Sequence, residues 1–242
     1  MDNIKLSIII PCYNEGQKLI NNIKKINTYL KQELPSLNYE IIGVNDGSKD
    51  NTKEIMKENE YKLLNTKFIS YEINRGKGGA VKEGVLNAKG EWILFMDADL
   101  STDISAIKTV LDNINSCNFI IGSRRHKDTI LVKKQGFKRK FIGNCCIIIT
   151  NILTGLHLLD TQCGFKAVKR NLATKIVKKQ TINRWAFDVE WLYIAKINKE
   201  RIKEIPIKWE NDEDSKVSAF SSSINFFLDL FKIIKKKKYY KF

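Results

Sequence analysis

Short apolar runs alternate with longer amphipathic stretches from Lys5 to Met96. The apolar runs are typical of β-strands, whereas the stretches between them repeat apolar residues with the period of an α-helix. Near-continuous apolar strands separated by helices indicate a parallel sheet that is covered on both faces. The sequence therefore predicts an α/β fold with a doubly wound, mostly parallel sheet of Rossmann-like type. The expected strands are Leu6 to Ile10, Tyr39 to Val44, Lys67 to Tyr71, Trp92 to Met96 and Asn118 to Gly122, and the expected helices lie at about 16–32, 51–60 and 78–88.

The pattern changes after residue 130. A basic segment, Lys133 to Lys140, precedes a strongly apolar one, Phe141 to Leu159, which is interrupted by polar residues. Its length is close to that of a membrane span, but its polar content favours a helix or helical pair that lies on a membrane surface. A helix of the protein core is the alternative. We expect the interfacial helical segment at about 136–157.

The end of the chain carries a second apolar pattern of helical period. It begins at Phe220, and Lys235 to Lys238 and two tyrosines follow it. A basic amphipathic helix with aromatic residues at its end suits an anionic bilayer interface. We therefore expect residues 220–242 to form such a helix.

Composition narrows the class of protein. The chain has 242 residues, of which 43% are hydrophobic, and this is enough for one large domain. The net charge of +15 implies a polyanionic partner: nucleic acid, an anionic membrane or a phosphorylated substrate. Five cysteines without C-x-x-C spacing, together with two histidines, favour neither a zinc site nor disulfides and fit a reducing cytosolic setting. The N-terminus lacks the pattern of a signal peptide, so we expect no export by that route.

Polar motifs follow the predicted strands. In a parallel α/β sheet, ligands bind beyond the carboxyl ends of the strands, so residues at these positions are candidates for a functional site. The motifs are Pro11 to Glu15, Asn45 to Ser48, Asp97 to Asp99, and Ser123 to Arg125.

Asp97 and Asp99 stand two residues apart at the end of an apolar run. In an extended backbone both carboxylates point to the same side. Two hard oxygen ligands suit Mg²⁺ or Mn²⁺, which takes its other ligands from waters and substrate phosphates. The sequence predicts a metal site that stabilises a departing diphosphate. A solvated loop is the alternative.

Two further stretches could bind a nucleotide. Asp46 lies in a turn-rich stretch, where its carboxylate could accept a hydrogen bond from a nucleobase N–H or could be only a turn residue. The stretch Asn74 to Ala80 places glycines and two cations, including Lys77, at a helix start, where backbone N–H groups favour anions. It matches neither the P-loop nor the dinucleotide-binding spacing.

The ordered motifs resemble those of the family-2 GT-A glycosyltransferases and, within them, the polyprenyl-phosphate sugar transferases. Three later stretches are similar to the dolichyl-phosphate β-glucosyltransferase branch, and the resemblance covers residues 5 to 220. The ordered motifs are Pro11 to Glu15, Val44 to Ser48, Gly76 to Ala80, Asp97 to Asp99, and Gly122 to Arg124. The later stretches are Asp160 to Lys166, Arg184 to Glu190, and Trp209 with Ser215 and Lys216.

The resemblance implies a role for each matching residue. Arg124 and Lys216 would contact phosphates. Asp160, Asp188 and Glu190 would lie near the sugar and the acceptor. The residues expected around the nucleoside are Pro11, Tyr13, Glu15, Val44 and Asp46. Those expected at the metal and diphosphate are Asp97, Ala98 and Asp99, and Lys77 would also contact the donor. The sequence departs from the family at Asn45, where an aspartate is common, and at Asp214, where glycine often precedes Ser-Lys.

The implied protein has a GT-A catalytic domain over residues 1–219 and the amphipathic helix over 220–242. It would be an inverting enzyme that moves a sugar, most simply glucose from UDP-glucose, onto a polyprenyl (dolichyl-type) phosphate. It would act as a peripheral protein on the cytoplasmic side of an anionic membrane. The sequence leaves open whether the protein has a membrane-protein partner or forms a homo-oligomer.

Two other functions remain as alternatives. Transfer to a hydroxyl of a glycolipid, polysaccharide or protein would need a carboxylate base such as Asp160 or Asp188. A lipid phosphate is already ionised and needs no such base. A basic nucleic-acid-binding module is the non-enzymatic alternative, but the lysines cluster beside apolar helical segments and no nucleic-acid motif is present. We therefore expect no nucleic-acid partner.

Overall fold

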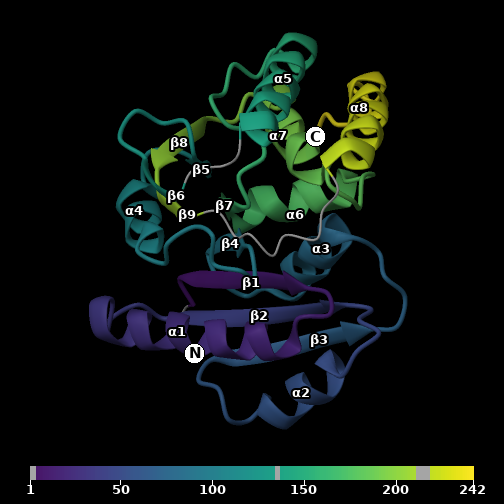
Figure 1. Ribbon diagram of the computed structural model, residues 1–242. Coiled ribbons are helices and arrows are strands. Elements are labelled where there is room, and N and C mark those ends of the chain that lie inside the picture. Colours follow the sequence, from purple (N-terminus) through teal and green to yellow (C-terminus); the bar gives the residue numbers. More distant parts are fainter. Residues whose placement is uncertain (1–3, 134–136, 211–218) are drawn as a thin grey trace.

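A seven-stranded sheet forms the centre of the protein (Figure 1), in the order β3-β2-β1-β4-β7-β5-β8. The computed structural model describes residues 4–133, 137–210 and 219–242. The strands of the sheet are β1 (Leu6–Cys12), β2 (Tyr39–Asp46), β3 (Thr66–Tyr71), β4 (Trp92–Met96), β5 (Phe119–Ser123), β7 (Phe165–Lys169) and β8 (Ile202–Pro206). The short strands β6 (Ile130–Lys133) and β9 (Lys208–Glu210) pair with each other in a second sheet.

The predicted α/β fold with a mostly parallel sheet is confirmed. The five predicted strands and three predicted helices appear within a few residues of their expected bounds. The helices are α1 (Gly16–Glu33), α2 (Thr52–Asn59), α3 (Lys77–Asn87), α4 (Ala106–Asn113), α5 (Phe137–Thr154), α6 (Arg170–Lys179), α7 (Phe187–Ile197) and α8 (Ala219–Lys235).

Strand β7 runs against its neighbours. It pairs antiparallel with both β4 and β5, and Phe165 lies opposite Met96. The beginning of β7 therefore lies beside the carboxyl end of β4. As a result, the segment 160–164 that leads into β7 reaches the same edge of the sheet as the motifs after β1, β2 and β4.

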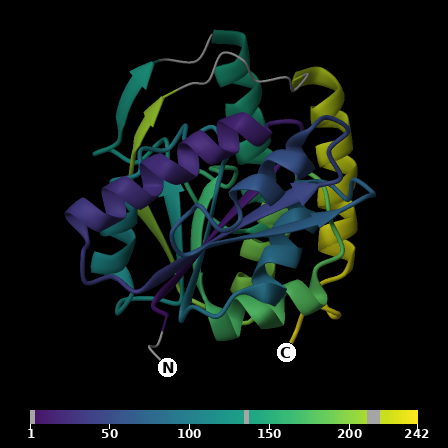
Figure 2. The same cartoon turned by 90° about the horizontal axis from the view of Figure 1, so that it is seen from below.

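Two hydrophobic cores cover the two faces of the sheet. Alternate residues of β4 point to opposite faces, as the pleat of a strand requires: Leu94 packs with α1 and α4, and Phe95 packs with α3, α6 and α7. Figure 2 shows α1 lying across one face. The sheet is therefore buried on both sides, which explains its near-continuous apolar strands.

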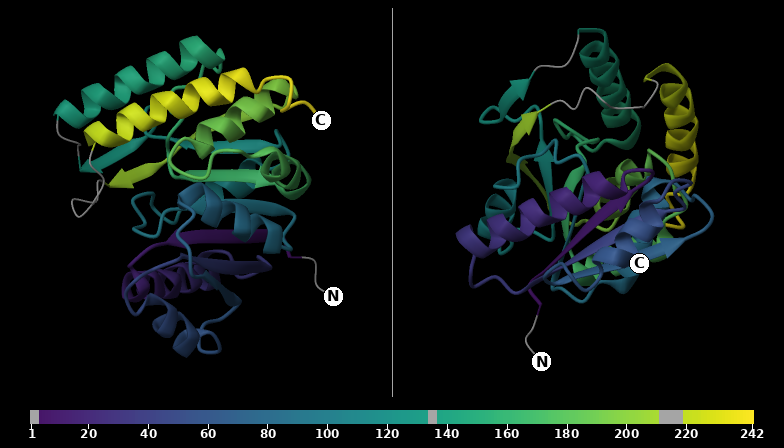
Figure 3. Two further views of the ribbon diagram at one scale, coloured as in Figure 1. Left: turned by 90° about the vertical axis from the view of Figure 1, so that its right-hand side faces the viewer. Right: turned by 60° about the horizontal axis from the view of Figure 1, so that its bottom comes forward.

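Helices α5 and α8 lie side by side at the end of the molecule away from α2 (Figure 3). The helix predicted at about 136–157 is α5, which ends before Gly155, a residue with φ of +63°. The helix predicted in the tail is α8, whose Phe226, Leu230 and Ile233 are buried in one of the two cores. Among the described residues, no helix is both long and apolar enough to span a bilayer.

Candidate active site

The first two motifs meet where β1 and β2 end. The Asn14 N–H donates to Ser48 Oγ at 2.9 Å, and the Lys49 N–H donates to the Asn14 side-chain oxygen at 2.8 Å. Asn14 and Gly47 have φ of +55° and +66°, which asparagine and glycine tolerate better than most residues. The turn residues of the two motifs therefore hold the two strand ends together.

The residues expected around a nucleoside lie at this edge. Pro11 and Val44 are buried and stand opposite each other in neighbouring strands. Tyr13 is 40% exposed, and Glu15 is partly exposed. Pro11 and Val44 thus lie in the interior beneath this edge, and the residues after β1 are the ones exposed at it.

Asp46 ends β2 and is buried. Its Oδ1 accepts hydrogen bonds from the Tyr71 hydroxyl at 2.6 Å and the Arg75 N–H at 2.8 Å. Its Oδ2 accepts from the Gly76 N–H at 2.9 Å and the Asn74 side chain at 3.0 Å. A carboxylate offers about four acceptor positions, so the protein itself fills those of Asp46. The carboxylate supports the loop before α3; the sequence had left open a bond to a nucleobase or a role in the turn alone.

The start of α3 is packed tightly against the segment before α7. The Gly79 N–H donates to the Asn183 carbonyl at 3.0 Å. A Cβ on Gly78 would lie 2.5 Å from the Cβ of Phe187, so only glycine allows this approach. Lys77 begins the helix, where backbone N–H groups and the helix dipole favour an anion.

Asp97 and Asp99 follow β4, and both are partly exposed. The Nζ of Lys77 forms an ion pair with Asp97 Oδ1. A Cβ on Gly164 would lie 2.0 Å from Asp97 Oδ2, so the segment before β7 closes over this carboxylate. Burial and then the charge of Asp97 raise the pKa of Asp99. Two carboxylates that share one ammonium group leave negative charge which a divalent cation could neutralise.

Among the residues that the structure describes, Asp97 and Asp99 could supply two ligands to a metal ion. Among the described residues, no group of three or more His, Cys, Asp and Glu side chains could hold a metal ion. Ala98, between the two aspartates, is buried, and its carbonyl accepts a hydrogen bond from the Asn22 side chain at 2.6 Å. Two partly exposed carboxylates fit Mg²⁺ or Mn²⁺, ions that take further ligands from phosphates and water.

Arg124 and Asp160 form a bidentate ion pair. The Arg124 Nε–H and Nη2–H groups donate to Asp160 Oδ2 and Oδ1 at 2.6 and 2.9 Å. Burial alone would raise the pKa of the fully buried Asp160, but the Arg124 charge outweighs burial and lowers that pKa to about 2. Asp160 is therefore a weak base. Arg125 is held by Asn144 of α5, whose side-chain oxygen accepts from its Nη2 at 2.7 Å.

Asp188 pairs with a lysine that sequence reasoning did not single out for a role of its own. The fully buried Lys166 donates from Nζ to Asp188 Oδ2 at 3.0 Å and to the Cys163 carbonyl at 2.6 Å. Cys163 precedes Gly164, so Lys166 also fixes the backbone that meets Asp97. The only signal in the sequence was a lysine inside an otherwise apolar run.

Two other expected residues remain, of which the structure describes one. Glu190 does not reach the site surface, because it is fully buried and accepts hydrogen bonds from Thr181, Ile182 and Tyr240. Lys216 lies outside the residues that the structure describes. The structure does bring the remaining charged candidates to one edge of the sheet, around the ends of β4 and β5 and the start of β7.

Comparisons with known proteins identify the family to which this chain belongs. The family model described as "Glycosyl transferase family 2" matches residues 7–177. A dolichyl-phosphate beta-glucosyltransferase of Dictyostelium discoideum is 38% identical and aligns with 96% of this chain and 75% of its own length. The dolichyl-phosphate beta-glucosyltransferase of Homo sapiens is 33% identical, over 93% of this chain and 74% of its own.

A solved structure shows the same fold. Glucosyl-3-phosphoglycerate synthase from Mycobacterium tuberculosis, in complex with Mn²⁺, UDP-glucose and phosphoglyceric acid, superposes with a TM-score of 0.66. The match covers 96% of this chain and 80% of that one at 13% identity, which establishes the fold alone. The family model and the two homologues establish more: the chain belongs to glycosyl transferase family 2, with a GT-A fold, and is a glycosyltransferase homologous to the dolichyl-phosphate beta-glucosyltransferases.

Proposed function

We propose that this protein transfers glucose from UDP-glucose to a polyprenyl phosphate of the dolichyl type at the cytoplasmic face of a membrane. The names of the homologues support this acceptor, and the UDP-glucose bound to the structural relative supports this donor. An oxygen of the acceptor phosphate attacks the anomeric carbon, and the bond from that carbon to UDP breaks. The displacement inverts the anomeric centre and gives a β-linked sugar phosphate.

The ion pairs that hold Asp160 and Asp188 are the observation on which the proposed acceptor rests. A hydroxyl acceptor needs a base to take its proton, and these are the two carboxylates that sequence analysis named for that role. Asp160 is held by Arg124, and Asp188 by Lys166. The Arg124 charge lowers the pKa of Asp160, and Lys166 occupies an oxygen of Asp188, whereas a phosphate is already ionised at neutral pH. The arrangement therefore favours a phosphate acceptor over a hydroxyl.

Asp97 and Asp99 are proposed to hold Mg²⁺ or Mn²⁺. A bound ion of this kind stabilises the negative charge that develops on the departing diphosphate. Mn²⁺ in the structural relative supports this assignment. Lys77, which contacts Asp97, is close enough to the two aspartates to share the same diphosphate.

The loop before α3 and the ends of β1 and β2 are proposed to hold the rest of the donor. Tyr13 and Glu15, which are exposed or partly exposed, are proposed to contact the nucleoside, and the buried Pro11 and Val44 to support that side of the site from the strands. Asp46 contributes indirectly, because it holds the backbone that leads to Lys77. Lys216, which lies outside the described residues, remains a proposed phosphate contact.

Helices α5 and α8 are proposed to carry the protein on the membrane. Ile148 and Ile152 of α5 are 57% and 74% exposed and share one face, as do Leu228 and Phe231 of α8 at 54% and 53%. The exposed lysines 235–238 end α8 and follow it. Apolar side chains next to a basic run suit an anionic lipid surface. Arg125, bonded to Asn144, links α5 to the acceptor side of the site.

We predict that purified protein transfers labelled glucose from UDP-glucose to a polyprenyl phosphate, and not to a glycolipid hydroxyl at the same concentration. The reason is that both candidate bases are ion-paired. Radiolabelled product separated by thin-layer chromatography is the measurement. Faster transfer to the hydroxyl would overturn the proposed acceptor. RNA or DNA binding without any UDP binding would instead favour a nucleic-acid-binding role.

Asp97→Asn and Asp99→Asn should each lower kcat roughly a thousandfold, because several kcal/mol of charge stabilisation on the leaving group is lost. Both variants should also bind Mn²⁺ more weakly when titrated in the presence of UDP. Asp103→Asn, which alters a partly exposed aspartate in the segment that follows, is the matched control, and circular dichroism checks the fold. Full activity in EDTA, or in both variants, would remove the metal assignment.

Asp46→Asn should raise the donor KM about tenfold, or about 1.4 kcal/mol, and change kcat much less. The new NH₂ group would face N–H donors, so the loop before α3 would lose its support. Steady-state kinetics with varied UDP-glucose is the measurement. Asp50→Asn, in the same turn-rich stretch but bonded to Thr52, is the control. An unchanged donor KM would contradict the supporting role of Asp46.

The double variant Ile152→Ser/Phe231→Ser should bind anionic vesicles about thirtyfold more weakly than the wild type, since it removes two apolar contacts of roughly 1 kcal/mol each. Binding of the wild type should also fall as salt rises. Co-sedimentation with vesicles measures both effects. Tyr61→Ser, which alters a 95% exposed side chain beyond α2, is the control. Point variants are needed because truncation of α8 would remove the buried Phe226.

Equal vesicle binding by the double variant and the wild type would show that these helix faces do not contact lipid. Equal binding to neutral and anionic vesicles would remove the electrostatic part of the proposal.

A further inference from the structure

A line of buried hydrogen bonds joins the end of the chain to the start of α3. Its centre is Glu190, a fully buried carboxylate on α7. Glu190 Oε1 accepts from the Thr181 N–H at 2.8 Å and the Thr181 hydroxyl at 2.6 Å, and Oε2 accepts from the Ile182 N–H at 2.9 Å. Glu190 therefore fixes the backbone of residues 181 and 182.

The segment held by Glu190 contacts the start of α3 directly. The side-chain amide of Gln180 donates to the Gly78 carbonyl at 3.0 Å, and the Asn183 carbonyl accepts from the Gly79 N–H at 3.0 Å. A Cβ on Gly76 would lie 2.6 Å from the Asn183 carbonyl oxygen. Any shift of residues 180–183 would therefore change the backbone on both sides of Lys77.

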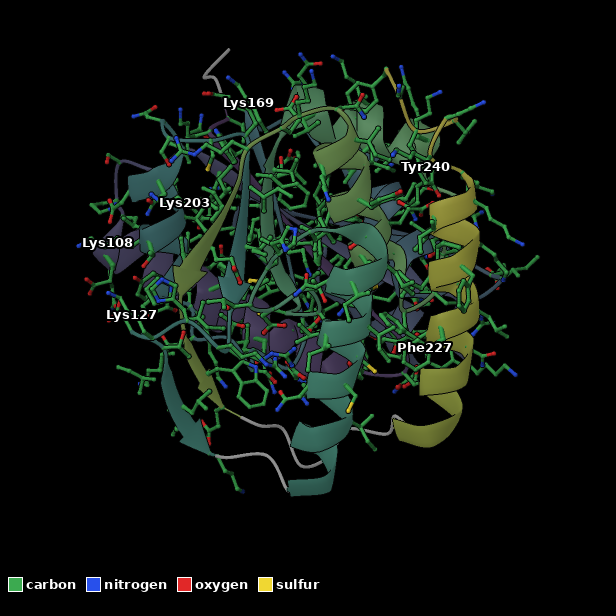
Figure 4. All side chains as sticks on the ribbon, turned by 90° about the horizontal axis from the view of Figure 1, so that it is seen from above. Lys108, Lys127, Lys169, Lys203, Phe227 and Tyr240 are labelled. Carbon is green, nitrogen blue, oxygen red and sulfur yellow. The ribbon has the colours of Figure 1, made fainter. Side chains whose placement is uncertain are left out.

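The end of the chain supplies the last hydrogen bond of this line. The Tyr240 hydroxyl donates to Glu190 Oε1 at 2.6 Å, and Tyr240, which follows α8 and is labelled in Figure 4, is fully buried. Its carbonyl accepts from the Asn198 side chain at 2.9 Å, and its ring packs edge-on against Tyr193 with centroids 6.3 Å apart. Burial and the bond to Glu190 raise the pKa of Tyr240, so the hydroxyl stays protonated and remains a donor.

The hydrogen bonds from Tyr240 through Glu190 end at the backbone beside the proposed donor site, and this position indicates what they do. Without the Tyr240 hydroxyl, Glu190 would keep only its bonds to residues 181 and 182, and the carboxylate could turn within its pocket. Because a buried charge is sensitive to the loss of any one partner, the segment 180–183 would then be less well fixed. Lys77, at the first position of α3, is the residue of this region that we propose to meet the donor diphosphate.

We propose that Tyr240 is a positioning residue for the donor site, which acts through Glu190 and residues 180–183 on the backbone that flanks Lys77. This inference rests on the proposed function, since it takes the start of α3 to bind the diphosphate of UDP-glucose. It assigns the end of the chain to the donor half of the site, far from it in sequence. None of the motifs that identify the family includes Tyr240.

Tyr240→Phe tests the inference, because it keeps the buried ring and removes the hydroxyl. Tyr239→Phe is the matched control: Tyr239 is adjacent and 48% exposed, and its ring contact with Lys179 is kept. The measurements are UDP affinity by calorimetry with Mn²⁺, the KM for each substrate, kcat and the melting temperature. We expect Tyr240→Phe to weaken UDP binding and raise the donor KM by about threefold to tenfold, with the acceptor KM within twofold of the wild type.

Glu190→Gln is the stronger variant, since its NH₂ group would face N–H donors, and it should weaken UDP binding by at least about tenfold. If this variant does not fold, Tyr240→Phe decides alone. A lower melting temperature with unchanged UDP affinity and donor KM in Tyr240→Phe would overturn the inference and leave Tyr240 with a purely structural role. Failure of the wild type to bind UDP would instead overturn the proposed function, and the inference with it.

Discussion

Negative charge that is buried near the strand ends has to be neutralised, and this constraint organises the protein. Four carboxylates, at Asp46, Asp160, Asp188 and Glu190, are at most 6% exposed. Removing a partner from such a group costs about 3–5 kcal/mol, so each needs its own donors. Asp46 has the loop before α3, Asp160 has Arg124, Asp188 has Lys166, and Glu190 has backbone N–H groups and Tyr240. These pairings fix the loops that surround the site. Asp97 and Asp99 differ, since they are more exposed and share one ammonium group, that of Lys77. The place where the protein leaves its own negative charge least compensated is therefore the place proposed for a divalent cation.

The fold, and the edge of the sheet at which the candidate site lies, could be predicted from the sequence because both depend on residues that are close together in the chain. The run Trp92 to Met96 is apolar and is followed at once by Asp97 and Asp99, so strand and motif are read from neighbouring residues. The antiparallel direction of β7 was not predicted, since it depends on pairing between segments some seventy residues apart in the chain. Lys166 was missed as a structural partner for a related reason. A lysine within a strand normally points to solvent, and only the three-dimensional structure places Asp188 beside it.

The tail shows the limit of helical periodicity most clearly. The spacing of its apolar residues predicted α8 correctly, but periodicity reports only that a face is apolar and not what covers it. In the structure Phe226, Leu230 and Ile233 are covered by the protein, whereas Leu228 and Phe231 are exposed. The same helix can therefore contribute to the core on one side and, as proposed, to a lipid contact on the other.

Asp46 shows a similar limit of what the sequence can predict. The sequence placed a carboxylate in a turn, but the four groups that donate to it come from residues 25 to 30 positions later.

The same constraint on charge bears on the proposed reaction. A phosphate acceptor brings its own negative charge toward a diphosphate donor, so the site has to offer cations and not a base. Arg124 is prepared for this, because Asp160 fixes its guanidinium through two parallel hydrogen bonds and thereby orients the remaining N–H groups. Lys77 stands on the donor side, and Arg125 on the side of α5. A hydroxyl acceptor would gain little from such an arrangement, since it carries no charge for these groups to neutralise and would still lack a base. In the proposed reaction, ion pairing thus serves the fold and the choice of acceptor at once: the contacts that make Asp160 and Asp188 tolerable inside the protein also occupy the oxygens with which they could take up a proton.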